Sequence, residues 1–513
     1  MRTVSLGESL TADDLLAAAR GEKLRLRLGQ DALERVERAR EVVRSIAAGE
    51  RAVYGVNTGF GALAKERIAP GDVGTLQRNL LLSHAVGTGP DLPAEEKRLA
   101  LLLRIHSMCR GASGVRPELL RWLIRLYDSG WLPRVPEQGS VGASGDLAPL
   151  AHLALPVIGA GEMVSPEGRV VSARRALPKI GLEPLQLEAK EGLALINGVQ
   201  VSNAIGLCAW ARMRDLSATA DVIAALSVEA LMGSHRPFDP RVTRLRPHRG
   251  ARDAAANLRR LLRGSQVVKS HAGCGRVQDP YSFRCTPQVH GAAKDGLRYL
   301  EQALLIEADS ATDNPLVFAA RGDTISAGNF HGQPIAMPLD HGAVVVAAWA
   351  NISERRTSTL LHPAMNNLLP AFLTPEPGLN SGLMIPQVVA AALCSEGKVL
   401  AHPASVDSIP TSADQEDHVS MANHAARKLR QAVTNAEHVL AIELYTAAQA
   451  REFHRELRAG VGAEAAYLLI RKHLPPLRHD RYLGPELEKA HQLVASGAVR
   501  RAAEKAIGRR LTP

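Results

Sequence analysis

Two identical tetrapeptides are the first residues in the sequence whose types and spacing point to chemistry. Residues 111–114 and 142–145 both read Gly-Ala-Ser-Gly, a serine hydroxyl held between small residues. Neither copy has the Gly-x-Ser-x-Gly pattern of a nucleophile elbow, and no strand–turn–helix pattern surrounds it. On composition alone, a simple turn is the expected structure of both copies.

A second glycine-rich stretch lies earlier in the chain, at residues 52–61. It reads Ala-Val-Tyr-Gly-Val-Asn-Thr-Gly-Phe-Gly, with three glycines and an asparagine in ten residues. Such a composition breaks the helical pattern and predicts a loop whose backbone can approach a ligand closely. Tyr54 lies in this loop and, taken alone, is expected to be a packing residue.

The residues around the second tetrapeptide, from Gln138 to His152, carry a specific resemblance. This stretch resembles the signature of the aromatic amino acid ammonia-lyase and aminomutase superfamily, whereas the first tetrapeptide is similar to a different, structural stretch of that family. The resemblance implies that Ala143, Ser144 and Gly145 cyclise to the electrophile methylidene-imidazolone (MIO), so that no external cofactor and no metal is needed. Glycine suits this closure, because the Gly145 nitrogen must attack the Ala143 carbonyl in a crowded backbone. An electrophile that captures an amine makes it a better leaving group.

Other positions match the family's functional residues in family order, from Tyr54 to about Met421. Tyr54 is implied as the catalytic base, and Arg284 as the planar, two-pronged donor that clamps the substrate carboxylate. Each match taken alone is equally compatible with a packed or turn residue. The residues implied to bind substrate are His84, Asn197, Gln278, Tyr281, Arg284, Asn314 and Phe330.

The stretch from Pro410 to Met421 discriminates between substrates. It resembles the version found in the histidine ammonia-lyases, with a carboxylate at Glu416. A carboxylate suits an imidazole, whose N–H groups need an acceptor in a desolvated pocket, whereas a phenyl ring would leave it unpaired. An alternative role for Glu416 is a helix N-terminal residue that opens the long helix after residue 420, and both roles are compatible.

The resemblance therefore implies elimination of ammonia from L-histidine to give urocanate, the first step of histidine degradation. Glu416 is implied to orient the imidazole together with His84 and to aid proton transfer. The family also implies a homotetramer with sites assembled from several subunits. The alternatives are a tyrosine or phenylalanine ammonia-lyase or a 2,3-aminomutase of the same superfamily, and a catalytically inactive helical scaffold.

Helical periodicity dominates the rest of the chain and must position these loops. A first helix is expected after Thr11, a plausible N-cap with Asp14 three residues later, and a second over 31–48. Short strands are expected at 169–172, 317–318 and 324–326. Further helices are expected over 76–84, 95–107, 118–127, 204–231, 292–309, 343–361, 387–400 and 421–450.

These elements predict a mainly α-helical protein built on a long helical bundle, with glycine-rich active-site loops at the helix ends. The resemblance implies a bundle of the aspartase/fumarase-like type. We expect residues 1–200 to form an N-terminal region with the MIO-forming and Tyr54 loops. Residues 201–513 are expected to form the bundle core and C-terminal helices, the whole being one continuous catalytic unit.

Composition excludes several other classes of protein. Lys and Arg number 62 against 52 Asp and Glu, for a net charge of +10, but the surplus is spread along the chain. Its densest run, 236–263, is broken by prolines and is expected to be a solvated surface, so no nucleic-acid partner is expected. Five scattered cysteines without a Cys-x-x-Cys pair favour a reducing, cytoplasmic location. No signal peptide and no membrane span is expected.

Overall fold

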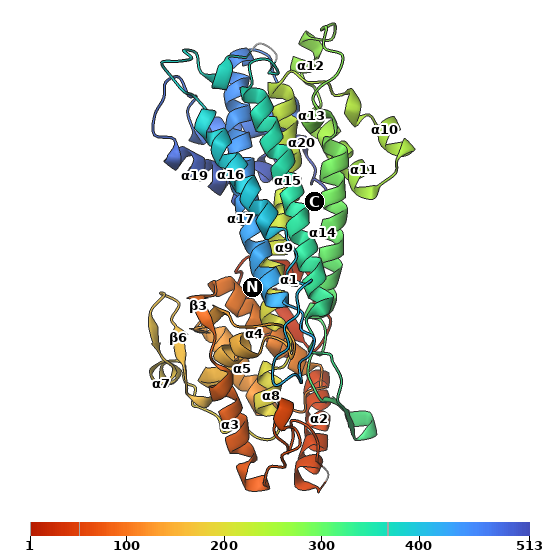
Figure 1. The fold of residues 1–513 in the computed structure, drawn as a ribbon, viewed down its shortest axis with the longest axis vertical. Helices are drawn as coiled ribbons and strands as arrows, with labels where there is room; N and C mark the ends of the chain where they lie inside the picture. Colours follow the sequence, from red (N-terminus) through yellow and green to blue (C-terminus); the bar gives the residue numbers. More distant parts are fainter. Residues whose placement is uncertain (1, 51, 367–368) are drawn as a thin grey trace. The chain divides into compact units, whose positions relative to one another are not determined.

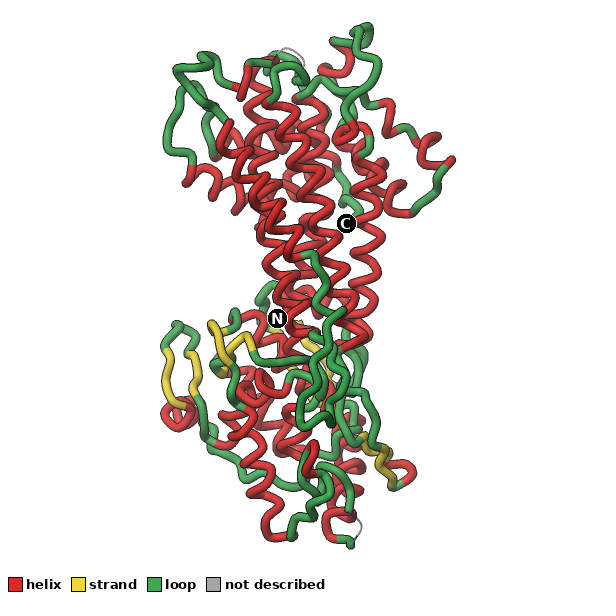
Figure 2. Tube along the Cα trace, in the orientation of Figure 1, coloured by secondary structure: helices red, strands yellow, loops and turns green. Residues whose placement is uncertain are grey.

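The computed structural model describes residues 2–50, 52–366 and 369–513, and these contain twenty α-helices (Figures 1 and 2). The expectation of a mainly helical protein is confirmed. The chain forms two compact units. The first contains residues 1–211, 301–340 and 403–427, and the second contains residues 212–300, 341–402 and 428–513. The division at residue 200 stays a prediction of domain organisation.

The first unit combines short helices with four small β-sheets. Its helices are α1 (Ala12–Ala19), α2 (Gln30–Ala48), α3 (Val73–His84), α4 (Ala94–Cys109), α5 (Pro117–Ser129), α6 (Leu147–Ala154), α7 (Ala173–Ala176) and α8 (Glu191–Ile196). Its strands are β1 (Arg2–Leu6), β2 (Leu24–Leu28), β3 (Thr88–Asp91), β4 (Leu132–Pro133), β5 (Pro136–Gln138), β6 (Glu162–Val164), β7 (Val170–Ser172), β8 (Leu316–Phe318) and β9 (Asp323–Ile325). The sheets pair β1 with β2, β3 with β5, β8 with β9, and β4, β6 and β7 in that order.

The N-terminus shows one confirmed prediction and one omission. Thr11 caps α1 through a capping box, in which its side chain accepts from the Asp14 amide and the Asp14 carboxylate accepts from the Thr11 amide. The parallel pair β1–β2, which places Arg2 opposite Leu24 and Leu6 opposite Leu28, was not expected. The three predicted short strands correspond to β7, β8 and β9.

Four of the five chain boundaries between the units lie inside long helices: α9 (Gln200–Ala230), α14 (Thr286–Ala308), α15 (Gln333–Leu361) and α17 (Ala422–Arg451). All four were predicted, but α15 begins ten residues before the expected start. Pro338 lies inside it, and proline normally ends a helical pattern. The remaining helices belong to the second unit: α10 (Pro240–Leu245), α11 (Arg249–Leu261), α12 (Val267–Ser270), α13 (Tyr281–Arg284), α16 (Met384–Leu400), α18 (Val461–His473), α19 (Gly484–Ala495) and α20 (Ala498–Ile507).

Within the second unit these long helices pack closely, as the predicted bundle requires. Gly342 of α15 lies so near α14 and α17 that a Cβ would come within 3.0 Å of Leu300 and 3.1 Å of Leu429. The hydroxyl of Ser227 on α9 donates to Glu443 on α17 over 2.6 Å. The bundle therefore joins all four helices through both apolar and polar contacts.

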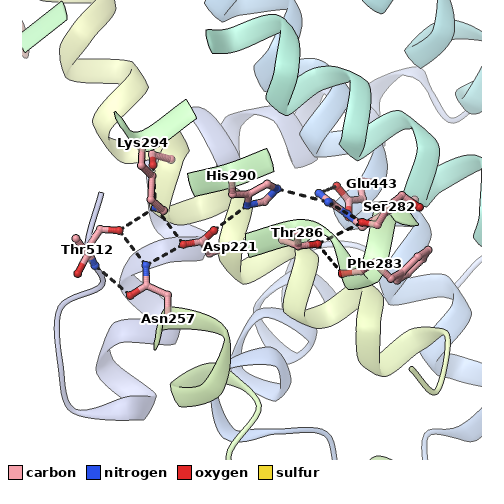
Figure 3. A network of polar contacts seen from close by, with 11 residues as sticks. Asp221, Asn257, Ser282, Phe283, Thr286, His290, Lys294, Glu443 and Thr512 are labelled. Atoms are coloured by element: carbon pink, nitrogen blue, oxygen red, sulfur yellow. Dashed lines mark hydrogen bonds and ion pairs between the residues drawn. The ribbon is translucent and has the colours of Figure 1, made fainter. Parts of the chain in front are cut away.

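A network of buried charges crosses this bundle (Figure 3). Asp221 accepts hydrogen bonds from His290 over 2.7 Å and Asn257 over 2.8 Å, and its other contact is Lys294 at 3.1 Å. Lys294 also donates to the carbonyl of Thr512, near the C-terminus, over 3.0 Å. Burial alone would raise the pKa of Asp221, but Lys294 and His290 hold that pKa below its usual value.

The same network reaches the short helix α13. Arg356 forms a fully buried, two-pronged ion pair with Glu443, at 2.5 and 2.8 Å. Its Nη1 donates to the carbonyl of Ser282 over 3.4 Å. Thr286 donates to the same carbonyl over 3.2 Å (Figure 3). The backbone around α13 is thus held by the buried side chains of Arg356 and Thr286.

One helix among the described residues, α15, is long and apolar enough to cross a membrane by length and composition. The expectation that no segment spans a membrane stays a prediction. About two thirds of its most apolar window (67%) is buried inside the protein, which is typical of a core helix.

Candidate active site

The loop that carries the second tetrapeptide lies between β5 and α6 in the first unit. Ala143 and Gly145 are buried, and Ser144 is half-buried. The Ser144 hydroxyl donates to Oε1 of Glu416 over 2.5 Å, and the Ser144 carbonyl accepts from the Asn197 amide over 3.0 Å. Three residues that are far apart in the sequence therefore meet at Ser144.

Glycine is required at Gly145 by both conformation and space. Its φ is +83°, and a Cβ there would lie 2.2 Å from the carbonyl oxygen of Gly198. Gly198 also accepts from the Asp146 amide over 2.7 Å, which fastens the two backbone segments together. Any larger residue at Gly145 would have to displace the backbone on which the loop rests.

A buried carboxylate that the sequence analysis did not single out supports this loop from behind. Asp146 is fully buried and accepts from the amide and hydroxyl of Ser202, both over 2.7 Å, and from the Ser140 hydroxyl over 2.9 Å. Burial raises the pKa of Asp146, although these hydrogen bonds oppose the rise. In the sequence, only the position of Asp146 directly after Gly145 could have indicated this supporting role.

Glu416 lies in a tight turn and not in a helix. Thr411 and Glu416 form an isolated antiparallel bridge, and the Thr411 hydroxyl donates to Oε2 of Glu416 over 2.6 Å. The residues between them include three in the left-handed region, 412–414. Because α17 begins only at Ala422, the expectation that Glu416 opens the long helix was wrong. The turn leaves both carboxylate oxygens directed at hydroxyl groups.

Tyr54 projects from the predicted glycine-rich loop, which packs on α2. The neighbouring Val53 and Val56 are buried in a cluster with Ala39 and Val43 of that helix. The Tyr54 hydroxyl accepts from the Gly61 amide over 3.4 Å. Burial raises the pKa of Tyr54, the Gly61 hydrogen bond opposes that rise, and the charge of Glu416 adds to it.

His84 ends α3 in the first unit and is half-buried. Its Nδ1 lies 3.0 Å from the Ser83 hydroxyl. Burial lowers the pKa of His84, and the Leu80 carbonyl and the charge of Glu416 partly offset that effect. Tyr54 and His84 therefore both lie within electrostatic reach of Glu416, and the lowered pKa of His84 favours its neutral form.

The backbone carbonyl of Asn197 is held by a fully buried arginine. Arg104 on α4 donates to the Asn197 carbonyl over 2.6 Å and to Oε1 of Gln200 over 3.1 Å. Burial lowers the pKa of Arg104 to about 10. This arginine, which the sequence analysis missed, fixes the turn that presents Asn197 to Ser144.

Asn314 and Phe330 also belong to the first unit. Asn314 is buried, and its amide oxygen accepts from the Ala327 amide over 2.8 Å and from the Ser326 hydroxyl over 3.1 Å. Phe330 is half-buried in the turn before α15. The Asn314 side chain therefore supports the loop at residues 326–327. Neither Asn314 nor Phe330 hydrogen-bonds through its side chain to residues 143–145.

Gln278, Tyr281 and Arg284 belong to the second unit, on and just before α13. The Arg284 guanidinium lies 4.5 Å from the centre of the Tyr281 ring, and Tyr281 is 71% exposed. The Nε of Arg284 is buried without a hydrogen-bond partner among the described residues. This guanidinium thus retains an unused donor, which an anionic ligand would satisfy.

Comparison with known proteins identifies the family to which the chain is similar. The sequence model of the family described as aromatic amino acid lyase matches residues 10–472. A histidine ammonia-lyase of Deinococcus radiodurans is 52% identical over 503 residues, covering 98% of this chain and 95% of the relative. The crystal structure of histidine ammonia-lyase from Trypanosoma cruzi has a TM-score of 0.91 at 40% identity, covering 99% of this chain and 96% of the other. That of a tyrosine aminomutase from Streptomyces globisporus has a TM-score of 0.94 at 34% identity, covering 99% and 100%.

Proposed function

The chain belongs to the aromatic amino acid lyase family, and we propose that it converts L-histidine to urocanate and ammonia as a histidine ammonia-lyase. The observation that carries this proposal is the pairing of Glu416 with Ser144 of the Ala-Ser-Gly sequence. It joins a carboxylate suited to an imidazole with the serine expected to become the electrophile. Two relatives that are 52% and 50% identical to this chain are named histidine ammonia-lyase.

The prosthetic group that we propose, MIO, fits the residues present. Gly145 has no Cβ to obstruct attack of its nitrogen on the Ala143 carbonyl carbon, and its positive φ already bends the backbone. Closure releases one water, and loss of the Ser144 hydroxyl with its α-proton releases a second, so no external cofactor is required. When formed, the group supplies an electrophile for the substrate amine.

Glu416 gives the proposed selectivity for histidine. Its Oε1 accepts from the Ser144 hydroxyl, and that hydroxyl is lost when MIO forms. Oε1 of Glu416 then lacks its hydrogen-bond donor, and an imidazole N–H of the substrate can take the place of the Ser144 hydroxyl. A phenyl ring would leave this carboxylate oxygen unpaired, which costs free energy in a partly buried site. We assign His84, which is neutral, to the same side-chain pocket.

Tyr54 is the proposed base that removes the β-proton of the substrate. Because burial raises its pKa, its phenolate is scarce at neutral pH but is a strong base once formed. We assign Asn197 to contacts with the substrate and the prosthetic group. We assign Asn314 and Phe330 to the substrate pocket. Arg284, with Gln278 and Tyr281, is assigned to the substrate carboxylate. The unused Nε of Arg284 supports the carboxylate assignment.

We further propose that the enzyme is a homotetramer, in which a neighbouring copy supplies Arg284, Gln278 and Tyr281 to the site. The helix α16 supports assembly, because its surface is apolar and largely exposed. Exposed fractions are 59% for Ile385, 52% for Val388 and 67% for Val399. We also propose a cytoplasmic location, because the five cysteines are scattered along the chain and form no Cys-x-x-Cys pair.

Two measurements test this function. The intact mass of the purified chain should be lower than that of the sequence by two waters, and Ser144→Ala should restore the full mass of its own sequence. Wild type should release urocanate from L-histidine, and Ser144→Ala should not. An intact mass without loss of water in an active enzyme would overturn the prosthetic-group proposal.

A further inference from the structure

Three side chains of the second unit, remote in sequence from every residue assigned above, gather on the surface between α17 and α19. They are His438, Glu488 and His491, and their potential ligand atoms all lie within 4.8 Å of one another. Glu488 and His491 are three residues apart on α19, so they share one face of that helix. The group contains two imidazoles and a carboxylate, which are ligand types that zinc prefers.

The ring of His491 lies between two carboxylates. Its Nε2 is 3.4 Å from Oε2 of Glu437, and its Nδ1 is 3.5 Å from Oε1 of Glu488. Glu437 is fixed by Arg212, which contacts it over 3.0 and 2.7 Å. A metal-bound histidine usually gives its other ring N–H to such a fixed carboxylate. This arrangement leaves Nδ1 of His491 and the carboxylate of Glu488 as the ligand pair.

The separation of that pair suits a shared metal ion. Ligand atoms about 2.0–2.1 Å from a tetrahedral zinc lie roughly 3.4 Å from each other. The observed Nδ1–Oε1 distance is 3.5 Å, which is longer than a strong charge-assisted hydrogen bond. The side chain of Glu488 is 54% exposed, so it can adjust around an ion.

His438 supplies the third ligand from α17. Its ring stacks on that of His491, with centroids 3.7 Å apart and planes 19° apart. The His438 side chain is half-buried, and one of its ring nitrogens lies within 4.8 Å of the potential ligand atoms of Glu488 and His491.

We propose that His438, Glu488 and His491 bind one Zn²⁺, with Glu437 as the carboxylate behind His491. The ion would link α17 to α19, which are already joined by a hydrogen bond of 2.7 Å from Tyr445 to Glu486. Three protein ligands leave a fourth position for water. No motif in the sequence indicates this metal site, because His438 and Glu488 are 50 residues apart and the ligands match no motif spacing.

The experiment uses the untagged, full-length protein, treated with a chelator and then titrated with ZnSO₄ by calorimetry and native mass spectrometry. Neither readout depends on ammonia-lyase activity, so the result is independent of the proposed function. We expect one zinc per chain and a Tm that rises with zinc concentration, because the ion binds the folded state. Glu488→Gln, which keeps the shape of the side chain, and His491→Ala should weaken binding by about 10- to 100-fold or more.

His473→Ala is the matched control, since His473 is an exposed histidine of the same unit outside the group. It should bind zinc as wild type does. If His491→Ala fails to fold, Glu488→Gln carries the test. The proposal is overturned if wild type lacks one tight equivalent of zinc, or if Glu488→Gln binds zinc as tightly as His473→Ala.

Discussion

Replacement of Glu416 by glutamine removes the charge that we propose orients the substrate imidazole, while keeping the size of the side chain. In the structure Oε1 accepts from Ser144 and Oε2 accepts from Thr411 over 2.6 Å. The Thr411 contact fixes the carboxylate, and loss of the Ser144 hydroxyl frees Oε1 for an imidazole N–H. The substitution therefore affects one charge-assisted hydrogen bond to the substrate.

The expected magnitude follows from that single bond. A hydrogen bond to a charged group contributes about 1.5–3 kcal/mol, which corresponds to roughly a 10- to 150-fold loss of kcat/KM for histidine. If Glu416 also moves a proton, the loss grows by about 100-fold or more. Asp417→Asn is the matched control, because Asp417 is the adjacent, exposed carboxylate and should leave kcat/KM unchanged.

The assay follows urocanate by its near-UV absorbance, and the intact mass of each variant reports whether the prosthetic group has formed. This separation matters because Glu416 contacts Ser144 before cyclisation. A Glu416→Gln enzyme that has lost two waters and keeps kcat/KM within twofold of wild type would refute the assignment of Glu416.

Three further changes test other parts of the account. Tyr54→Phe should lower kcat/KM by about 100-fold or more, and should abolish its rise with pH. In wild type that rise should continue into the alkaline range, because burial raises the pKa of Tyr54 and the phenolate is the active form; a flat pH–rate profile would contradict this. Gly145→Ala should prevent loss of water from the chain, since its Cβ would lie 2.2 Å from a backbone oxygen, whereas Gly168→Ala, with the same φ of +83° but open space, should keep it. Lys190→Met should lower the free energy of unfolding, measured with urea, by about 3–5 kcal/mol. The reason is that Lys190 Nζ lies 2.9 Å from the buried carboxylate of Asp313, which the substitution leaves without its partner. A change below about 1 kcal/mol would show that this pair is dispensable.

Most of the fold was predictable because its elements follow local rules. The capping box at Thr11 and the apolar stripes of the long helices are properties of short segments, and each predicted helical segment overlaps an observed helix. The parallel strand pair was missed although β2 reads Leu-Arg-Leu-Arg-Leu, an alternation with a period of two. Its partner β1 is separated from it by a helix, so only tertiary structure reveals the pairing.

The candidate site was predictable only where residue type alone carries the chemistry. The resemblance identified Ser144 and Glu416, and the structure brings them into contact. It could not identify Arg104 or Asp146, since their importance comes from burial and from partners far along the chain. The turn that presents Glu416 was also unpredictable, because non-glycine residues occupy the left-handed region there.

The most direct test of the central claim is a near-UV time course of the purified enzyme with L-histidine, L-tyrosine and L-phenylalanine supplied separately at equal concentration. We expect urocanate to accumulate with L-histidine. We expect neither coumarate from L-tyrosine nor cinnamate from L-phenylalanine. Accumulation of coumarate or cinnamate without urocanate would contradict the assignment of Glu416 to an imidazole. No product absorbance with any of the three, from a chain that has lost two waters, would contradict the ammonia-lyase reaction itself and favour an aminomutase.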